Sequence, residues 1–306
     1  HEIQGVIALE NSFNRVGLDH VMLVRIASTA VSAQLLGCDR EQMLNAVSHA
    51  WLDGSSLRTY RHAPNTGSRK SWAAGDATAR GLFLALMAKR GEMGYPSAVT
   101  APVWGFQDVL FKGNELSFKQ EYGTYVMENI LFKISYPAEF HAQTAVEAAI
   151  NLHSLVKDKL DTIEKIVIET QESGNRIINK TGKLNNPADR DHCIQYMVAI
   201  GLIKGALVAE DYEDDIANLP IVDQIRAKMQ VSENTRYSKE YLEADKRSIG
   251  NAIQVFFKDG TSTHLESVDY PVGHRRRREE GIPLLVEKFE HSITSHMTEE
   301  SARKLM

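Results

Sequence analysis

Residues 163–170 read Ile-Glu-Lys-Ile-Val-Ile-Glu-Thr, an alternating, β-branched stretch in the middle of a chain whose other long segments have helical spacing. Such alternation is typical of a half-buried strand. Residues 252–258 and 261–268 give a second strand signal, because they flank Asp259-Gly260, a favoured two-residue hairpin turn. Strands are therefore expected to cluster in the middle of the chain.

Helices are predicted on both sides of these strands. Apolar residues at helical spacing favour helices over 21–36, 40–52, 71–90, 141–155, 188–205 and 282–292, with a short one after Thr298. Asp39 is the expected N-cap of the second helix. We therefore expect a mostly helical α+β fold, with an all-helical domain formed by both chain ends (1–130 and 273–306) and a smaller α+β lid domain over 131–272.

Composition limits the classes of function. The 306 residues can form one large core or two smaller ones, and a net charge of −5 gives no overall field for nucleic acid or for an acidic membrane. Cys38 and Cys193 are too few for a disulfide framework or a four-cysteine cluster, so a reducing compartment is expected. The sequence also has no run of 18 apolar residues, so a membrane is not an expected partner. Nucleic acid is not an expected partner either, because of the negative net charge.

A basic loop precedes the helix that begins near residue 71. Residues 56–76 read SLRTYRHAPNTGSRKSWAAGD and carry five potential cations: Arg58, Arg61, His62, Arg69 and Lys70. Turn formers occupy 63–67, and cations beside the free N–H groups of a helix N-terminus suit a small polyanion. A solvated basic surface loop is the alternative. The run Arg275–Arg278, followed by two glutamates, is expected to be a solvated, partly self-neutralised turn.

Several ordered strings make the chain similar to the MmgE/PrpD family. They are RTYRHAPNTG (58–67), RKSWAAGDA (69–77), PVWGF (102–106), SYPAEFH (135–141), NNPADRDHCIQY (185–196) and YPVGH (270–274). The resemblance spans essentially the whole chain. The opening HEIQG (1–5), without Met, resembles a string well inside the family's helical domain, so we expect a further segment to precede it in the family.

The resemblance implies an activity and a setting. It implies dehydration of 2-methylcitrate to 2-methyl-cis-aconitate, a hydro-lyase step of the methylcitrate cycle in propionate catabolism, with citrate and cis-aconitate as a side reaction. It also implies a substrate site between helical body and lid. Apart from the resemblance, we expect a homodimer formed through the helical domain, because its Ala, Leu and Met residues offer apolar helix faces beyond what one core needs. A cytoplasmic location (the mitochondrial matrix in a eukaryote) agrees with the expected reducing compartment. Dehydration needs a base, an acid and cations for the carboxylates, and we expect side chains alone to supply them, without metal or organic cofactor.

The resemblance also implies site residues. The expected catalytic residues are His20, Lys70, Lys133, His141 and Tyr196, and the expected substrate-binding residues are Arg58, Arg61, His62 and Arg69. Each has a structural alternative, such as a helix-capping histidine, a surface lysine or a core tyrosine with its hydroxyl bonded locally. The family commonly places the histidine matching His141 two residues further from the proline. Base and acid are not separable from the sequence, although a histidine is the preferred base.

Two other functions stay open. A decarboxylase acting on cis-aconitate needs the same carboxylate-binding groups and a proton donor to carbon, and CO2 release from cis-aconitate distinguishes it. A chain without the family's leading helices is alternatively an inactive fragment or one half of a nicked enzyme, which a search for a companion polypeptide by mass measurement distinguishes.

Overall fold

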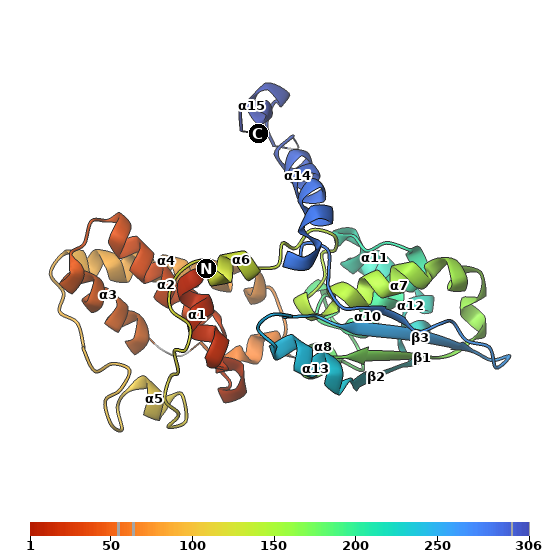
Figure 1. Cartoon of the computed structure of the whole chain (residues 1–306), viewed down its shortest axis with the longest axis horizontal. Helices are drawn as coiled ribbons and strands as arrows, with labels where there is room; N and C mark the ends of the chain where they lie inside the picture. The colour runs from red at the N-terminus through yellow and green to blue at the C-terminus, as the bar shows by residue number, and fades with distance from the viewer. Residues whose placement is uncertain (54–55, 63–64, 295, 306) are drawn as a thin grey trace. The chain divides into compact units, whose positions relative to one another are not determined.

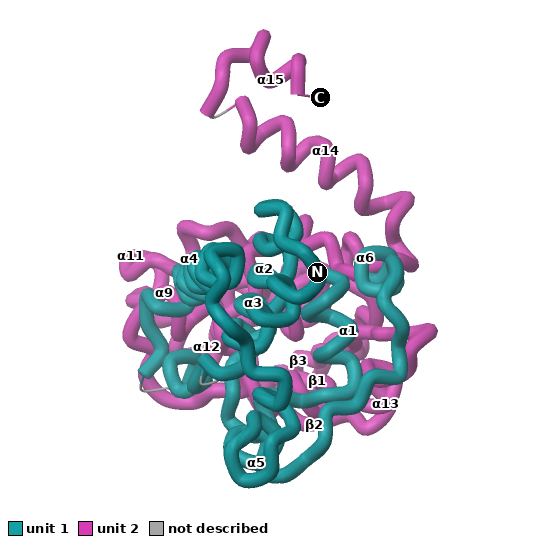
Figure 2. Tube along the Cα trace, turned by 90° about the vertical axis from the view of Figure 1, so that its left-hand side faces the viewer, with its two compact units in different colours: residues 1–129 teal, residues 130–306 magenta. Residues whose placement is uncertain are grey.

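The structure is a computed structural model that describes residues 1–53, 56–62, 65–294 and 296–305. Its contacts divide the chain into two compact units, His1–Asn129 (unit 1) and Ile130–Met306 (unit 2), coloured separately in Figure 2. Unit 1 is helical and unit 2 combines helices with one four-stranded sheet, so the predicted mostly helical α+β class is confirmed. The grouping of 273–306 with 1–130 around a 131–272 lid stays a prediction.

Unit 1 is built on three long helices (Figure 1). Its elements are α1 (Glu2–Glu10), η1 (Phe13–Val16), α2 (Val21–Leu35), α3 (Arg40–Leu52), η2 (Arg58–Arg61), α4 (Arg69–Lys89), α5 (Phe106–Val109) and α6 (Tyr125–Asn129). The predicted N-cap is confirmed, because the Asp39 carboxylate accepts from Gln42 N–H and Gln42 returns a capping-box bond. Helix α2 packs against both α3 and α4.

A glycine sets the distance between α2 and α4. A Cβ atom on Gly81 of α4 would lie 2.9 Å from Thr29 N and 3.1 Å from Arg25 O of α2. Only a residue without a side chain permits this approach. The buried cluster beside it includes Met22, Leu23, Ile26, Trp51, Leu84 and Phe106. Close helix packing therefore fixes the start of α2, where His20 lies.

Unit 2 alternates helices and strands. Its elements are η3 (Phe140–Ala142), α7 (Gln143–Val156), η4 (Lys157–Thr162), β1 (Ile163–Thr170), α8 (Glu172–Ile178), α9 (Pro187–Arg190), α10 (Ile194–Lys204), η5 (Ala209–Tyr212), α11 (Asp214–Ala217), α12 (Pro220–Arg226), β2 (Met229–Glu233), α13 (Thr235–Leu242), β3 (Asn251–Phe257), β4 (Glu266–Val268), η6 (Arg275–Arg277), α14 (Arg278–Thr294) and α15 (Glu299–Leu305). The sheet order is β2-β1-β3-β4, parallel between β1 and β2 and antiparallel elsewhere.

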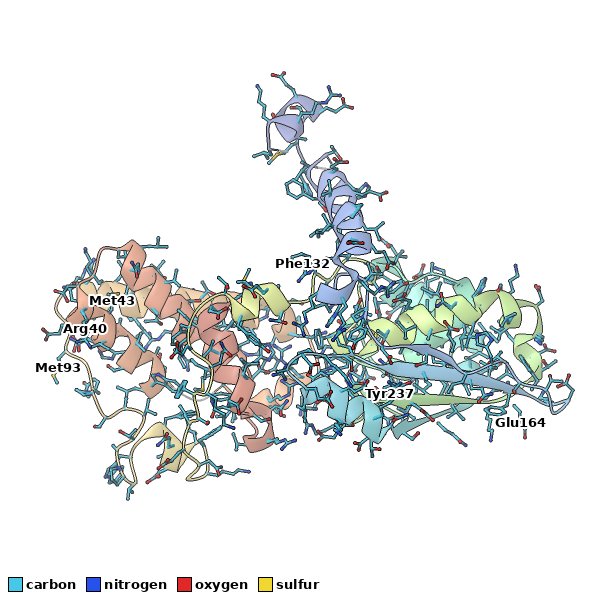
Figure 3. The ribbon with its side chains drawn as sticks, viewed as in Figure 1. Arg40, Met43, Met93, Phe132, Glu164 and Tyr237 are labelled. Atoms are coloured by element: carbon cyan, nitrogen blue, oxygen red, sulfur yellow. The ribbon has the colours of Figure 1, made fainter. Side chains whose placement is uncertain are left out.

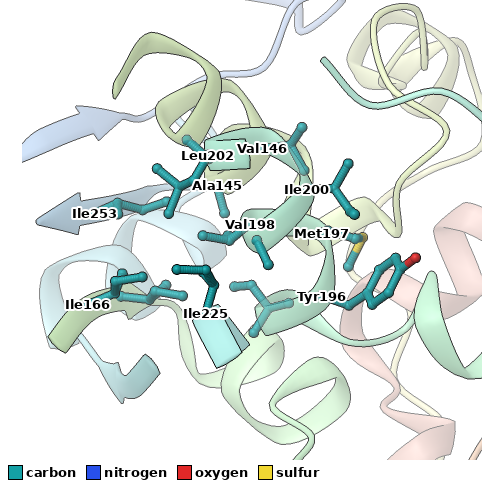
Figure 4. Close-up of a cluster of buried hydrophobic side chains, with 14 of the residues drawn as sticks. Ala145, Val146, Ile166, Tyr196, Met197, Val198, Ile200, Leu202, Ile225 and Ile253 are labelled. Atoms are coloured by element: carbon teal, nitrogen blue, oxygen red, sulfur yellow. The ribbon is translucent and has the colours of Figure 1, made fainter. Parts of the chain in front are cut away.

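One face of the sheet carries the core of unit 2. Ile166 and Ile168 of β1 alternate with exposed or half-buried neighbours, and Ile253 lies opposite Ile168 on β3. Their side chains pack with those of α7 and α10, as the close-up in Figure 4 shows for Ile166, Ile253 and Val198. Because α10 is buried along nearly its whole length, it is the central helix of the unit. Its first turn carries Tyr196.

The strand prediction over 163–170 is confirmed to the residue, and two neighbouring predictions need correction. The predicted helix 188–205 is two helices, α9 and α10, because Asn186 caps a short first helix and Cys193 has extended backbone before the second. The predicted strand 261–268 pairs regularly only over β4, because Val255 N–H donates to the Thr263 hydroxyl and not to a backbone carbonyl. A turn is present there, but it has three residues and not two, because Gly260 N–H donates to the Phe257 carbonyl and Phe257 N–H donates to the Thr261 carbonyl, with Gly260 at φ +84°.

The arginine run 275–278 is not a solvated turn. Arg277 does pair with Glu280, as predicted, but it also bonds Glu147 at 2.9 Å. Arg278 donates to the Ile130 carbonyl and stacks 3.6 Å from the ring of Phe132, which is labelled in Figure 3. The contacts of Arg278 therefore hold the start of α14 against the first residues of unit 2. Across the described ranges, no helix combines the length and the apolar character needed to cross a membrane.

Candidate functional site

In unit 1 the basic loop is organised around a buried carboxylate. Asp19 is fully buried, and it accepts from Arg61 Nε at 2.5 Å, from Arg61 Nη2 at 3.4 Å and from Val21 N–H at 3.0 Å. Arg58 Nη1 lies 3.5 Å from the same carboxylate. Burial raises the pKa of Asp19, but the Arg61 hydrogen bond, the charge of His20 and the Val21 N–H together lower it below its usual value. Asp19 is therefore ionised near neutral pH, and its bonds hold η2 against the start of α2.

The arginines of this loop differ in what they contact. Arg61 is 9% exposed and its fork is occupied by Asp19, so the structure gives it a positioning role. Arg69 lies on the surface, with its guanidinium 4.3 Å from the ring of Trp72 and 3.4 Å from Asp76 Oδ2. Stacking and an exposed ion pair leave the planar fork able to exchange partners. Arg69 is thus better placed than Arg61 to take up a carboxylate.

The remaining unit 1 candidates surround this loop. His20 is the N-cap residue of α2 without a side-chain capping bond, and 60% of its side-chain surface is open. Desolvation lowers the pKa of His20, Arg61 and Arg58 add to that, and Asp19 opposes it. Lys70 is half-buried in the first turn of α4, and its N–H donates to the Gly67 carbonyl. His62 is exposed just after η2.

The turn predicted at 63–67 is only partly visible. Ala63 and Pro64 lie outside the described residues. The described part has Asn65 N–H donating to the His62 carbonyl at 2.8 Å. The helix after the turn begins at Arg69 and not near residue 71, so Arg69 and Lys70 both lie in its first turn, which holds no acidic residue. Two cations in the first turn are unfavourable, because they lie at the positive end of the helix dipole. The dipole favours an anion at this place.

Unit 2 has a second cluster around Glu139, a carboxylate whose side chain is 11% exposed. Glu139 accepts from the His141 N–H at 2.7 Å and from His141 Nδ1 at 2.9 Å, while Tyr241 Oη lies 3.4 Å from His141 Nε2. Burial opposes ionisation of Glu139, but the charge and hydrogen bonds of His141, with further charge from His192, lower its pKa to about 2. Because Glu139 can only accept, the proton of neutral His141 is assigned to Nδ1, so Nε2 accepts from the Tyr241 hydroxyl and acts as a base only once this long bond is given up.

Lys133 belongs to the same electrostatic cluster. Burial lowers its pKa, and the charge of Lys288 adds to this, while Glu139 and Asp191 raise it. Asp191 in turn pairs with His192 at 2.9 Å. Lys133 is nevertheless an exposed residue of unit 2, as the surface-lysine alternative predicted. Motif spacing does not indicate Glu139, Tyr241 or Asp19, although Glu139 stands two residues before His141 and Asp19 stands next to His20.

Tyr196 is more deeply buried than the other candidates. It is 1% exposed, its hydroxyl donates to the Asp211 carbonyl, and its ring stacks on Tyr212 at 5.9 Å. Burial is the main cause that raises its pKa to about 12, so the hydroxyl is neutral. Figure 4 shows the residue at the edge of the core of unit 2. It also contributes to the wall of a pocket lined by residues 180–184, 190, 195–196, 217–218, 223, 226–227 and 229.

Metal ligands do not gather in the described part of the chain. Among those residues, no group of three or more His, Cys, Asp or Glu side chains has a geometry that could hold an ion. The two cysteines are buried and free. The clusters that the structure does form, around Asp19 and around Glu139, combine one carboxylate with cations and a histidine. Such groups can bind carboxylates and move protons.

The scaffold is thus a mostly helical α+β fold that carries two clusters of carboxylate, histidine and basic side chains, and sequence comparison assigns its family. Residues 1–119 match the MmgE/PrpD N-terminal domain and residues 136–306 match the MmgE/PrpD C-terminal domain. The chain therefore belongs to the MmgE/PrpD family, as the sequence motifs predicted.

Its relatives carry one activity in their names. The chain is 60% identical to a 2-methylcitrate dehydratase of Escherichia coli (strain K12), covering 100% of this chain and 64% of that protein. It is 62% identical to one of Cupriavidus necator (96% of this chain, 61% of that protein). A mitochondrial 2-methylcitrate dehydratase of Yarrowia lipolytica is 60% identical, with 100% and 59% covered. The chain thus spans about three fifths of the length of these relatives.

Proposed function

We propose that the protein is a hydro-lyase that dehydrates 2-methylcitrate to 2-methyl-cis-aconitate, with citrate as a weaker substrate. The Glu139–His141 pair carries the proposal, because a carboxylate on Nδ1 orients the ring and leaves Nε2 as the base. The names of relatives at 60% and 62% identity supply the substrate. Acid–base and electrostatic groups of the protein carry the reaction in this proposal.

The proposed steps balance one proton removed against one proton added. His141 Nε2 takes the proton of the C–H beside a carboxylate, and the C=C bond forms as the hydroxyl on the neighbouring carbon leaves. Lys133, with its lowered pKa, donates the proton that lets the hydroxyl leave as water. Lys70 and Arg69, at the start of α4, are proposed to hold carboxylates and to stabilise the charge that builds during proton removal. Arg58 and His62 are proposed as further carboxylate contacts, and His20 and Tyr196 as further acid–base groups.

A matched pair of histidine variants tests the base. Replacing a general base costs about 10²–10⁴-fold in kcat. His141→Gln should therefore abolish most 2-methylcitrate dehydration, followed as appearance of the unsaturated product. His264→Gln is the control, because His264 is exposed and pairs with Glu266 at 2.8 Å in the same unit. Equal activity of both variants would exclude His141 as the base.

A decarboxylase is the second lyase that the same groups would suit. It would release CO2 from cis-aconitate. We expect the rate of this CO2 release not to exceed the rate at which the protein dehydrates 2-methylcitrate. We also propose a cytoplasmic enzyme, or a mitochondrial one in a eukaryote, which the name of the Yarrowia lipolytica relative supports.

A homodimer formed through unit 1 is a further part of the proposal. Leu82, Phe83 and Leu86 expose apolar surface along α4, which supports an additional partner face. Light scattering at micromolar concentration should report twice the mass of one chain.

A further inference from the structure

Unit 2 holds a basic pocket that the proposed reaction does not explain. Its volume is about 580 Å³, and it lies between the loop after α8, the first turn of α10 and the residues of α12. Four cations line it: Lys180, Lys183, Arg190 and Arg226. Asp223 is the one carboxylate among the described lining residues. Cations therefore outnumber carboxylates in the lining, although Asp189, Asp214 and Asp223 each lie within 4.0 Å of one of them.

Two of these cations are already committed to the protein. Arg190 is 4% exposed, and it donates to the Tyr212 carbonyl and to Asp214 Oδ1 at 2.6 Å. Arg226 pairs through Nη1 with the exposed Asp223, and through Nη2 it donates to the Gly182 carbonyl at 3.0 Å. The second bond holds the loop 180–184 against α12. Hydrogen bonds and ion pairs of these two side chains therefore hold the pocket wall in place.

The other donors lack acceptors. Arg226 Nε and Lys180 Nζ are both buried without a hydrogen-bond partner, in side chains that are only 10% and 12% exposed. The carboxylate nearest to Lys180 Nζ is Asp189 Oδ1 at 3.8 Å, too far for a hydrogen bond. Buried donors of this kind are normally satisfied, by protein, by water or by a ligand. A ligand with negatively charged oxygens would satisfy both.

The rest of the lining indicates what such a ligand carries besides its charge. Leu184, Ala217, Ala227 and Met229 form an apolar part of the wall, and Asn218 supplies an amide. We propose that this pocket binds a small organic anion with a dianionic head, a phosphate ester or a polycarboxylate. Arg226 and Lys180 hold the head, exposed Lys183 attracts it, and the apolar wall takes the organic part. This site is separate from the residues proposed for turnover, apart from Tyr196, and it does not depend on the proposed function.

Binding measurements on four variants test the site. The probes are inorganic phosphate and citrate, titrated calorimetrically at low ionic strength, where charges are least screened. Arg226→Met and Lys183→Met should each weaken binding about 10- to 100-fold, the usual loss for one bond to a charged group. Lys183 is exposed, so its variant keeps the fold even if Arg226→Met loosens the loop. Lys239→Met removes an equally exposed charge from α13 and should change nothing.

The fourth variant separates this site from the basic loop of unit 1. Lys70→Met should leave phosphate binding unchanged if phosphate occupies the pocket of unit 2, whereas it should weaken the binding of citrate at the proposed substrate site. Tighter binding of phosphate would identify a phosphate ester as the ligand class, and tighter binding of citrate a polycarboxylate. The proposal is overturned if neither probe binds up to about 10 mM, if Arg226→Met and Lys183→Met bind both probes as Lys239→Met does, or if Lys70→Met abolishes phosphate binding. None of these outcomes depends on turnover, so they do not decide the dehydratase proposal.

Discussion

Two clusters of the molecule are built around a carboxylate with little exposed surface, and they differ in the partner that neutralises it. Asp19 in unit 1 is held by Arg61 and Arg58, whereas Glu139 in unit 2 is held by His141. Both carboxyl groups have lowered pKa values. Arginine keeps its charge at every pH that a folded protein tolerates, but histidine gains or loses a proton near neutrality. The first cluster is therefore suited to holding a loop in place, and the second to moving a proton.

The largest expected effect is on the arginine-held carboxylate. Asp19→Asn leaves Arg61, 9% exposed, without its anionic partner. Removing one member of a buried ion pair costs about 3–5 kcal/mol of unfolding free energy, because the other charge stays desolvated. Urea unfolding should show this loss. The control Asp76→Asn breaks the exposed pair with Arg69 and should cost less than about 1 kcal/mol. Similar losses in both variants would show that Asp19 does not organise the loop.

The histidine-held carboxylate predicts a dependence of stability on pH. The pKa of Glu139 falls from 4.5 to about 2 on folding, so its ionised form stabilises the protein above about pH 4.5, and this contribution disappears as the pH falls towards 2. The full contribution is about 3 kcal/mol, at ~1.4 kcal/mol for each pKa unit. The difference in unfolding free energy between the wild-type protein and Glu139→Gln should therefore shrink by about 2 kcal/mol between pH 6 and pH 3.

A surface glutamate provides the control for this experiment. Glu164 of β1, labelled in Figure 3, is exposed, so Glu164→Gln should follow the wild-type protein at every pH. A constant difference between the wild-type protein and Glu139→Gln would mean that His141 does not hold the charge of Glu139. In that case the tautomer assigned to His141 would lose its basis.

The third effect concerns substrate and not stability. Lys70→Ala removes a proposed carboxylate contact at the start of α4, and the loss of one bond to a charged group costs roughly 1.5–3 kcal/mol, or about ten- to a hundredfold in kcat/KM. The loss should be larger at low ionic strength. Arg61→Lys should instead lower the unfolding free energy, because lysine cannot reproduce the two bonds to Asp19. If Lys70→Ala lost only stability, the loop would be structural throughout.

The sequence predicted local patterns well and their partners poorly. The strand 163–170 and the capping box of Asp39 depend on neighbours along the chain, and both are confirmed. The strand predicted over 261–268 was wrong outside β4, because the hydroxyl of Thr263 replaces a backbone acceptor. Hydrophobic periodicity does not reveal such a side-chain bond. The same limit applies to the site. The sequence indicated Arg61 as a cation near a pocket, but only folding brings Asp19 to it across 42 residues.

The smallest expected effect concerns a neutral hydrogen bond. It shows how much such a bond contributes to the unfolding free energy, compared with the two charged clusters. Tyr196→Phe removes the hydroxyl that donates to the Asp211 carbonyl and leaves the ring on Tyr212. A neutral bond of this kind contributes about 1 kcal/mol, so the unfolding free energy should fall by about that amount, well below the loss in Asp19→Asn. If the hydroxyl also assists the leaving group, kcat falls while KM changes little, as we propose. A variant with reduced stability and unchanged kcat would make Tyr196 a core residue and leave proton transfer to Lys133 and His141.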